Sequence, residues 1–260
     1  MRPGIPYDPA LDPPLEQDAL PTGRELLPNG TAVLVSRGHR FGTDSLLLAR
    51  FCRLRRQEKA CDLGTGCGVI PLYWHDAGHR GLAAGLEISP AGAALLAKAA
   101  ESIPHITALC GDLRTLGTPH CPPALAEKLP AGSFDLVSCN PPYFTGGFVS
   151  EKPGRAAARH ALTCTLTDAF AAAAYLLRDR GSFCICCRPE RLAEAFAAAA
   201  AARLEPKRLQ LVRPSFDDPP RLFLLDCRKN ARPGLLFEPD IAGPVDFFDQ
   251  QHTDPSVGKE

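Results

Sequence analysis

The stretch Asp62-Leu63-Gly64-Thr65-Gly66-Cys67-Gly68 places three alternating glycines directly after a short apolar segment, residues 59–63. Glycine accepts positive φ angles and lets a ligand come close to the backbone. A strand that ends in a tight glycine loop and continues as a helix is typical of open α/β sheets, which bind ligands beyond the carboxyl ends of their strands. We therefore predict a ligand-binding loop at residues 64–68, against the alternative of a tight turn without a ligand.

The spacing of these glycines restricts the class of ligand that the loop can bind. A loop that holds a dinucleotide diphosphate has its third glycine one place later, and a mononucleotide P-loop carries a lysine. This chain has GxGxG and no such lysine. We expect a ligand that lacks a diphosphate.

On both sides of the loop, apolar and helical patterns alternate along the chain. Strands are expected at residues 31–36, 59–63, 82–88, 106–111, 134–139, 182–187, 207–212 and 222–227. Helices are expected at residues 45–54, from the glycine loop to about 77, and at 90–102, 166–177 and 190–203. This alternation predicts an α/β fold with a mostly parallel sheet and helices on both faces. The last two strands have no helix between them, which predicts an antiparallel edge.

Composition suggests one domain with two tails. Residues 1–22 hold six prolines without periodicity and are expected to form a flexible tail. Residues 23–237 are expected to form the domain, and residues 238–260 an acidic, disordered tail. Residues 113–132 are rich in proline and are expected to be a connection.

The distribution of charge and the cysteines indicate which binding partners and which cellular compartment to expect. The chain has 29 basic and 29 acidic side chains, but residues 151–232 hold fifteen basic and nine acidic ones. This basic excess permits an anionic partner such as nucleic acid, although solvated arginines would look the same. There is no apolar run of membrane-spanning length and no secretory signal, so we expect a cytoplasmic protein whose eleven cysteines are reduced. We predict no metal site at the cluster of Cys184, Cys186 and Cys187.

Two acids follow the next two predicted strands. Glu87 ends the segment 82–88 and is suited to accept both hydroxyls of a ribose. Asp112 follows the segment 106–111 and is suited to accept from an adenine amino group. Each alone could be a helix cap. Together, beside the glycine loop, they predict an adenosine pocket.

The loop Asn140-Pro141-Pro142-Tyr143 follows the predicted strand 134–139. The prolines stiffen the loop, and the Asn140 amide oxygen and the Pro141 carbonyl are both acceptors. Tyr143 offers an aromatic face for stacking. Two acceptors and a ring are suited to a planar exocyclic amine, whose lone pair is delocalised until hydrogen bonds draw the nitrogen toward tetrahedral geometry. A rigid loop without a catalytic role is the alternative.

Over residues 25–237 this arrangement resembles the Rossmann-like methyltransferases that use S-adenosylmethionine. The NPPY loop resembles that of the amino-methyltransferases acting on adenine, guanine or protein glutamine. The resemblance implies that Asn140, Pro141 and Tyr143 act on the amine. It also implies a set of cofactor-binding positions, namely Asp62, Gly64, Thr65, Gly66, Gly68, Glu87, Asp112, Leu113 and Asn140.

The segment from Gly38 to Ala49, GHRFGTDSLLLA, resembles that of the tRNA adenine-N6 methyltransferases that modify the adenine 3′ of the valine anticodon. In that family it lies over the cofactor, which implies that Thr43 and Asp44 contact the methionine end, although either could simply cap a helix. Arg159-His160 also resembles the family, but Ala161 stands where glutamate is usual, so the sequence lacks the third residue of an Arg-His-Glu network. The expected RNA contacts are Pro142, Phe144, Lys152, Arg155, Arg159, His160, Lys207 and Arg208.

The leading hypothesis is an adenine-N6 methyltransferase acting on RNA, with tRNA as the first candidate substrate. A protein glutamine methyltransferase of the release-factor type shares both motifs but usually carries a helical N-terminal domain, for which the 30 residues before the first expected strand leave little room. A guanine-N2 rRNA methyltransferase and an inactive RNA-binding module are further alternatives. The sequence does not indicate an oligomeric state.

Overall fold

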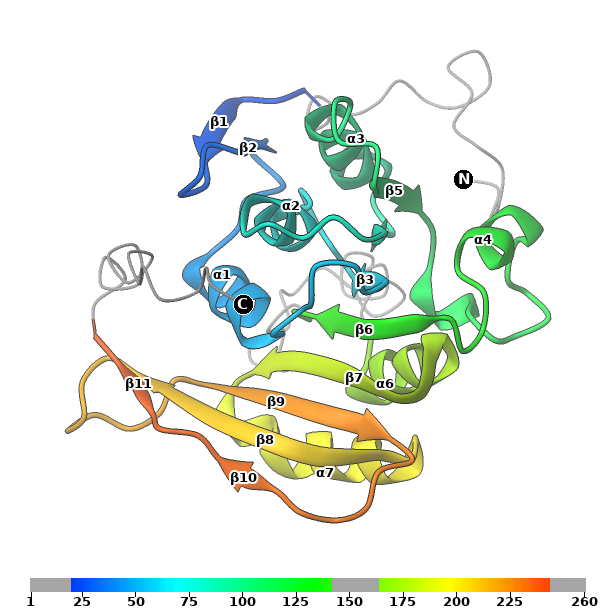
Figure 1. The fold of residues 1–260 in the computed structure, drawn as a ribbon. Helices are drawn as coiled ribbons and strands as arrows, with labels where there is room; N and C mark the ends of the chain where they lie inside the picture. The colour runs from blue at the N-terminus through cyan, green and yellow to red at the C-terminus, as the bar shows by residue number, and fades with distance from the viewer. Residues whose placement is uncertain (1–19, 142–163, 244–260) are drawn as a thin grey trace, which may run out of the picture.

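A computed structural model describes residues 20–141 and 164–243, whose central feature is a large mixed β-sheet (Figure 1). Five parallel strands lie in the order β5-β4-β3-β6-β7. Their bounds are Ile106–Cys110, Ala83–Glu87, Ala60–Leu63, Phe134–Cys139 and Leu177–Cys187. Beyond β7 come β9 (Leu222–Lys229) and β8 (Leu204–Arg213), each antiparallel to its neighbour, which confirms the predicted antiparallel edge.

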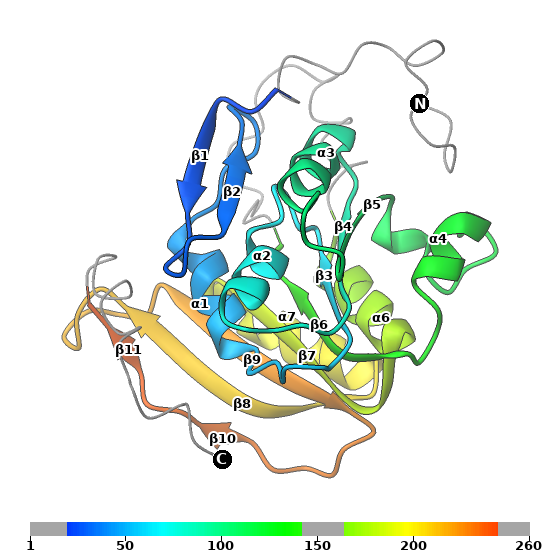
Figure 2. The ribbon, with the colours of Figure 1, turned by 45° about the horizontal axis from the view of Figure 1, so that its top comes forward.

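Helices cover both faces of this sheet, as the alternating pattern predicted (Figure 2). On one face lie α1 (Thr43–Phe51), α2 (Val69–Asp76) and α3 (Pro90–Ala99). On the other lie α4 (Pro123–Lys128), α6 (Leu166–Leu176) and α7 (Leu192–Ala201). Each face has its own core of buried apolar side chains, so the sheet is sandwiched between two hydrophobic layers.

Local sequence explains where several elements begin. All four residues of β3 are buried, as expected for a central parallel strand covered on both faces. Ser89 caps α3 by accepting from the Gly92 amide, and Pro90 takes the first helical position, where no amide donor is needed. Thr165 and Asp168 form a reciprocal capping box at the start of α6.

The structure differs from the predicted elements at several places. A strand β1 (Gly23–Leu26) pairs with β2 (Ala32–Val35) in a hairpin beside the main sheet, within the expected domain but not predicted as a strand. The proline-rich connection contains η2 (Leu113–Thr115) and the short helix α4, because Pro122 and Pro123 lie at its start, where proline is tolerated. A further 3-10 turn, η3 (Pro189–Arg191), precedes α7.

The expected boundary at residue 237 also falls inside ordered pairing. Strands β10 (Leu236–Phe237) and β11 (Ile241–Ala242) lie parallel to β8 and extend the sheet past it. Two acids of the expected tail pair with arginines of the body: Glu238 contacts Arg53 and Arg208, and Asp240 contacts Arg213. The acidic tail is therefore docked on basic residues at least as far as Ala242. Within the described residues, no helix is long and apolar enough to cross a membrane.

Candidate active site

The predicted glycine loop joins β3 to α2 at the carboxyl edge of the sheet. Gly64, Gly66 and Gly68 all have positive φ, at 70°, 58° and 83°. The amides of Gly64 and Thr65 donate to the Leu86 carbonyl on β4, which ties the loop to the neighbouring strand. Among the described residues, a methyl group added to Gly64 or Gly66 would meet no atom within 4 Å, whereas one on Gly68 would lie 2.3 Å from Leu96. Gly64 and Gly66 thus keep space open above the loop, and Gly68 permits close helix packing.

Glu87 ends β4 and braces the glycine loop. One carboxylate oxygen accepts from the Gly66 amide at 2.8 Å and the other from the Ser89 amide at 2.9 Å. The residue is 8% exposed. Its carboxylate therefore lies beside the loop, where the predicted ribose would be, and it also fixes the backbone of both the loop and the start of α3.

Asp62, the last but one residue of β3, is almost completely buried. Ser138 on the neighbouring strand β6 donates a 2.6 Å hydrogen bond to its carboxylate. Burial raises the pKa of Asp62 to about 7; the Ser138 and Thr65 hydroxyls oppose this shift, and the negative charge of Glu87 adds to it. The residue therefore changes its charge near neutral pH, directly beneath the loop.

Asp112 lies beside Glu87, since the Gly111 amide donates to the Glu87 carbonyl. Its side chain caps η2 by accepting from the Arg114 amide and pairs with the Arg114 guanidinium at 2.7 Å. Burial tends to raise the pKa of Asp112, but the hydrogen bonds and charge of Arg114 outweigh it, and the pKa is lowered. Asp112 is an ionised acceptor at the predicted place, with a capping role as well. Leu113 is half-buried and packs against the hydrophobic core that lies between the sheet and α4, α6 and α7.

Asn140 and Pro141 follow β6, and Cys139 pairs in register with Leu63 just before the glycine loop. The glycine loop and the first half of the NPPY loop are therefore neighbours at one edge. The Asn140 side-chain nitrogen donates to Asp44 at 3.0 Å and to the Ser45 hydroxyl at 2.9 Å. Pro141 is buried. Pro142, Tyr143 and Phe144 lie outside the described residues.

The segment before α1 reaches the same edge. The helix starts at Thr43 with Gly42 as its N-cap, so Thr43 and Asp44 are in its first turn rather than capping it. His39, which precedes α1, lies close to the glycine loop. A methyl group added to Gly92 would lie 2.9 Å from each of the His39 ring, the Glu87 side chain and the Gly66 carbonyl. His39 thus lies against the Glu87 side of the loop. Residues 39–45 therefore extend from the side of Glu87 to Asn140.

Three of these side chains were not among the predicted site residues. Ser45 and Ser138 bind Asn140 and Asp62, and the buried Nδ1 of His39 has no hydrogen-bond partner among the described residues. An orphaned ring nitrogen, open space above two glycines and a buried carboxylate fit a polar, phosphate-free ligand such as S-adenosylmethionine. His39 and Ser45 lie within the 38–49 segment singled out in the sequence, whereas Ser138 had no such signal.

The structure corrects one predicted RNA contact. Arg208 is 9% exposed, and its guanidinium binds Asp226 at 2.8 Å, the Phe51 carbonyl at 2.8 Å and Glu238 at 3.3 Å. It is a structural residue, because these partners hold it inside the protein. Lys207 is half-exposed and donates to the Arg232 carbonyl. Lys152, Arg155, Arg159 and His160 lie outside the described residues.

Thiol chemistry is not favoured near the loop. Burial raises the pKa of Cys67 to about 11, and burial also raises that of Cys110 beside Glu87. Both thiols stay protonated at neutral pH and are poor nucleophiles. Across residues 20–141 and 164–243, no three His, Cys, Asp or Glu side chains are grouped to hold a metal ion.

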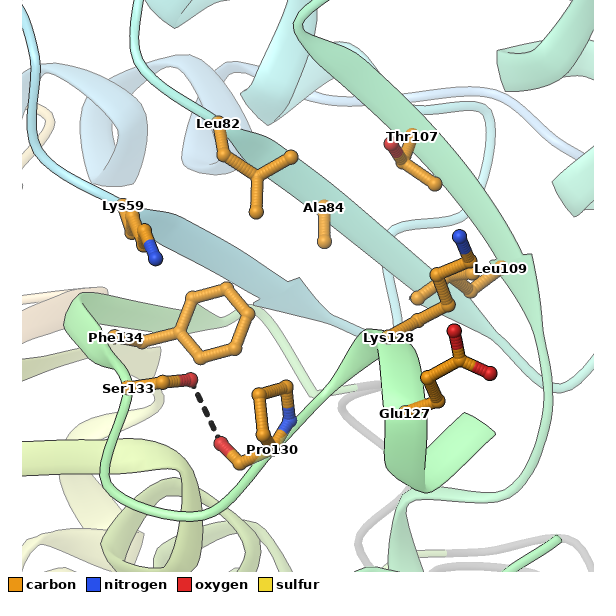
Figure 3. A pocket seen from close by; sticks show the side chains of 10 residues that line it. All are labelled: Lys59, Leu82, Ala84, Thr107, Leu109, Glu127, Lys128, Pro130, Ser133 and Phe134. Carbon is orange, nitrogen blue, oxygen red and sulfur yellow. Dashed lines mark hydrogen bonds between the residues drawn. The ribbon is translucent and has the colours of Figure 1, made fainter. Parts of the chain in front are cut away.

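A cavity of about 340 Å³ lies elsewhere, between the sheet and α4 (Figure 3). Lys59, Leu82 and Phe134, which line it, stand at or just before the starts of β3, β4 and β6. It is therefore near the amino-terminal ends of these strands, opposite the glycine loop. None of the predicted site residues lines it.

Two relatives of this chain among known proteins have the same name. No protein-family profile matches the chain. A tRNA1(Val) (adenine(37)-N6)-methyltransferase of Shewanella amazonensis is 32% identical over 126 residues, 47% of this chain and 49% of the relative. The enzyme of that name from Porphyromonas gingivalis is 28% identical over 196 residues, 73% of this chain and 74% of the relative. The match to the Shewanella protein spans about half of that protein's length.

Solved structures share the fold at low sequence identity. A predicted O-methyltransferase from Agrobacterium tumefaciens has a TM-score of 0.58 and 21% identity, over 76% of this chain and 86% of that one. Geranyl diphosphate C-methyltransferase from Streptomyces coelicolor, solved with S-adenosyl-L-homocysteine, has a TM-score of 0.51 and 14% identity, over 71% and 74%. The predicted methyltransferase-type α/β fold is therefore confirmed.

Proposed function

We propose that this chain is an S-adenosylmethionine-dependent methyltransferase that methylates the exocyclic N6 amine of adenine in RNA, with tRNA as its substrate. The observation that carries the proposal is the adjacency of the glycine loop and Asn140-Pro141 at the ends of the paired strands β3 and β6. A methyl donor above the loop and an amine at Asn140 would meet at one place. The named relatives, all tRNA adenine-N6 methyltransferases, support the choice of base and RNA.

The cofactor would be held by residues of three strand ends. Glu87 would accept from the ribose hydroxyls, and Asp112 would accept from the adenine amine. Gly64 and Gly66 would let it approach the backbone, and the ionised form of Asp62 would favour its positive charge. When bound, the cofactor supplies an electrophilic methyl group on a sulfonium.

The chain's own residues would then prepare the amine. The Asn140 side-chain oxygen and the Pro141 carbonyl would each accept a hydrogen bond from the N6 amine, drawing its lone pair out of the adenine ring. This nitrogen would receive the methyl group that the bound cofactor supplies, with S-adenosylhomocysteine as the leaving group, and water would take the extra proton. Asn140 is a neutral amide and does not act as a base. Positioning and preorganised acceptors would therefore supply the catalysis.

The test is methyl transfer from radiolabelled S-adenosylmethionine to unmodified bulk tRNA, to rRNA and to a release factor in parallel, followed by nucleoside digestion. We expect N6-methyladenosine from tRNA. The Asn140→Ala variant should lose transfer while its Kd for the cofactor stays within about twofold of the wild type, because the amide acts on the amine. Label in the release factor would instead assign the glutamine class. N2-methylguanosine from rRNA would assign the guanine class.

A further inference from the structure

Asp44 on α1 faces Asn140 across the site. The Asn140 nitrogen lies 3.0 Å from one Asp44 oxygen and 2.9 Å from the Ser45 hydroxyl. A carboxylate only accepts hydrogen bonds, so the group that faces it must be the NH₂ and not the oxygen of the amide. Both amide hydrogens of Asn140 therefore point toward the start of α1.

This orientation decides what the rest of the amide presents. The NH₂ and the oxygen are the two branches of one planar group, so fixing one fixes the other. With both hydrogens directed at α1, the remaining branch, Oδ1, only accepts. Turned by 180°, the amide would direct its hydrogens at the incoming amine, which needs acceptors to free its lone pair.

Asp44 is itself held firmly enough to set this orientation. Its second oxygen accepts from the Ser45 amide at 2.9 Å, and the residue lies in the first turn of α1, where the helix dipole favours a negative charge. A methyl group on Gly42 would lie 2.6 Å from the Asp44 carboxylate, so the glycine leaves room for it. The helix is anchored by the Trp74 indole, which donates to the Ala49 carbonyl.

We propose that Asp44, assisted by Ser45, is a positioning residue that holds the Asn140 amide with its oxygen toward the substrate amine. The proposal rests on the function proposed above and assigns Asp44 a role different from the predicted contact with the methionine end of the cofactor. The two roles predict different defects. A positioning residue affects kcat, whereas a cofactor contact affects the Kd for the cofactor.

The experiment compares Asp44→Ala and Ser45→Ala with wild type in steady-state methyl transfer to tRNA and in calorimetric cofactor binding. We expect Asp44→Ala to lower kcat by about 10- to 100-fold, by analogy with the loss found when residues that orient metal ligands are removed. Its cofactor Kd and its KM for tRNA should stay within about threefold of wild type. Ser45→Ala, which keeps the carboxylate contact, should lose less.

A matched control is Asp135→Ala. Asp135 is the second residue of β6, the strand that ends before Asn140, and its carboxylate accepts from the Lys59 amide and pairs with Arg178 at the opposite end of the sheet. The Asp135→Ala variant loses structural contacts comparable to those lost in Asp44→Ala, but none of them involves the site. We expect a similar fall in melting temperature for Asp135→Ala and Asp44→Ala but unchanged kcat for Asp135→Ala at a temperature where both variants are folded.

A rescue pair separates orientation from mere contact. Asn140→Asp places two carboxylates against each other and should be nearly inactive at neutral pH. Asp44→Asn in that background restores a donor–acceptor pair, with the donor now on α1, and should recover at least about tenfold in kcat over Asn140→Asp. This recovery is expected because the new NH₂ again engages one oxygen of residue 140 and leaves the other as an acceptor.

The outcomes separate the two proposals. Absence of transfer to any RNA by wild type would overturn the proposed function, and the positioning role with it. An active wild type with unchanged kcat in Asp44→Ala would overturn the positioning role alone. So would a rise of tenfold or more in cofactor Kd that accounts for the whole loss, or an Asp44→Asn change that fails to improve Asn140→Asp.

Discussion

Asp62 on β3 and Ser138 on β6 are register partners on neighbouring parallel strands, and the Ser138 hydroxyl donates to the Asp62 carboxylate at 2.6 Å. Both residues are buried, at 1% and 0% exposure. One hydrogen bond between two interior side chains thus links the strand before the glycine loop to the strand before Asn140. The link also carries a carboxyl whose pKa is raised to about 7 by burial.

The raised pKa of Asp62 predicts how stability changes with pH. Because the folded pKa is above the unfolded value of 3.8, the folded protein holds this proton longer than the unfolded chain. The stabilisation is complete below pH 3.8 and is lost as pH rises to about 7. At about 1.4 kcal/mol per pKa unit, the loss is roughly 4 kcal/mol. The Asp62→Asn variant, which still accepts a hydrogen bond from Ser138, should not show this pH-dependent loss of stability.

Urea unfolding at several pH values between 4.5 and 7.5 checks this prediction. The stability of Asp62→Asn relative to wild type should increase steadily with pH over that range. Parallel stability curves for the two proteins would mean that Asp62 does not titrate there.

A second pH dependence concerns the proposed cofactor. A cationic ligand above the loop favours the ionised form of Asp62, so binding should release a proton whenever this carboxyl is protonated beforehand. The affinity for S-adenosylmethionine should therefore rise between pH 5.5 and pH 7.5, by at most about tenfold per pH unit below the pKa. Calorimetry in buffers of different ionisation enthalpy measures both effects. Asp62→Asn should bind with a much flatter pH profile, and an equally steep profile would assign the proton to another group.

Substitution of two glycines of the loop by alanine should have different effects, one on cofactor binding and the other on stability. The methyl group of Gly66→Ala contacts none of the described residues, so the change carries the backbone cost of positive φ, about 1–2 kcal/mol. It should nevertheless weaken cofactor binding by about tenfold or more, ~1.4 kcal/mol, because the methyl group enters the ligand's space.

Gly68→Ala is the matched comparison, because its methyl group meets Leu96 instead. It should lower the melting temperature more than Gly66→Ala does. Unchanged cofactor affinity in folded Gly66→Ala would show that the ligand does not lie above this glycine.

Arg208 should matter for stability and not for RNA. Its removal leaves Asp226, which is 2% exposed, without its charge partner, and breaking such a buried pair costs about 3–5 kcal/mol. The guanidinium also lies 4.2 Å from the centre of the Phe51 ring. Arg208→Ala should unfold at much lower urea concentration. Its tRNA affinity, measured below that transition, should match wild type.

Arg53→Ala is the control for Arg208→Ala, since both arginines pair with Glu238. The Arg53 side chain is 66% exposed, so this change should cost about 0–1 kcal/mol. A loss of RNA affinity in Arg208→Ala that exceeds its loss of folded protein would restore the original assignment.

Much of the fold could be predicted because its elements carry strong local signals. The predicted strand 134–139 matches β6 (Phe134–Cys139) in full, and predicted helix 90–102 contains α3 (Pro90–Ala99). Weakly apolar or tertiary-dependent elements were missed. The short strand β1 has a mainly exposed sequence, and its signal comes only from pairing with β2. The helix predicted to run to Leu177 ends one residue earlier because Leu177 pairs with Phe134 as the start of β7.

The candidate site divides in the same way. Glu87 and Asn140 were predictable because each follows a strand whose carboxyl end must lie at the common edge. Their partners were not. Ser45 is 95 residues from Asn140, and Ser138 is 76 residues from Asp62, and nothing in the local sequence pairs them. The burial of Arg208 depends likewise on Phe51, 157 residues away.

The pairing of β10 and β11 with β8 has a practical consequence for shortening the chain. An uncovered edge strand offers unpaired amides and carbonyls to other molecules and favours self-association. Cutting the chain after residue 237 would remove β11, along with Glu238 and Asp240, and would uncover part of β8 beside Arg213. A fragment designed for expression or crystallisation should therefore extend at least to Ala242, so that this border stays closed to neighbouring molecules.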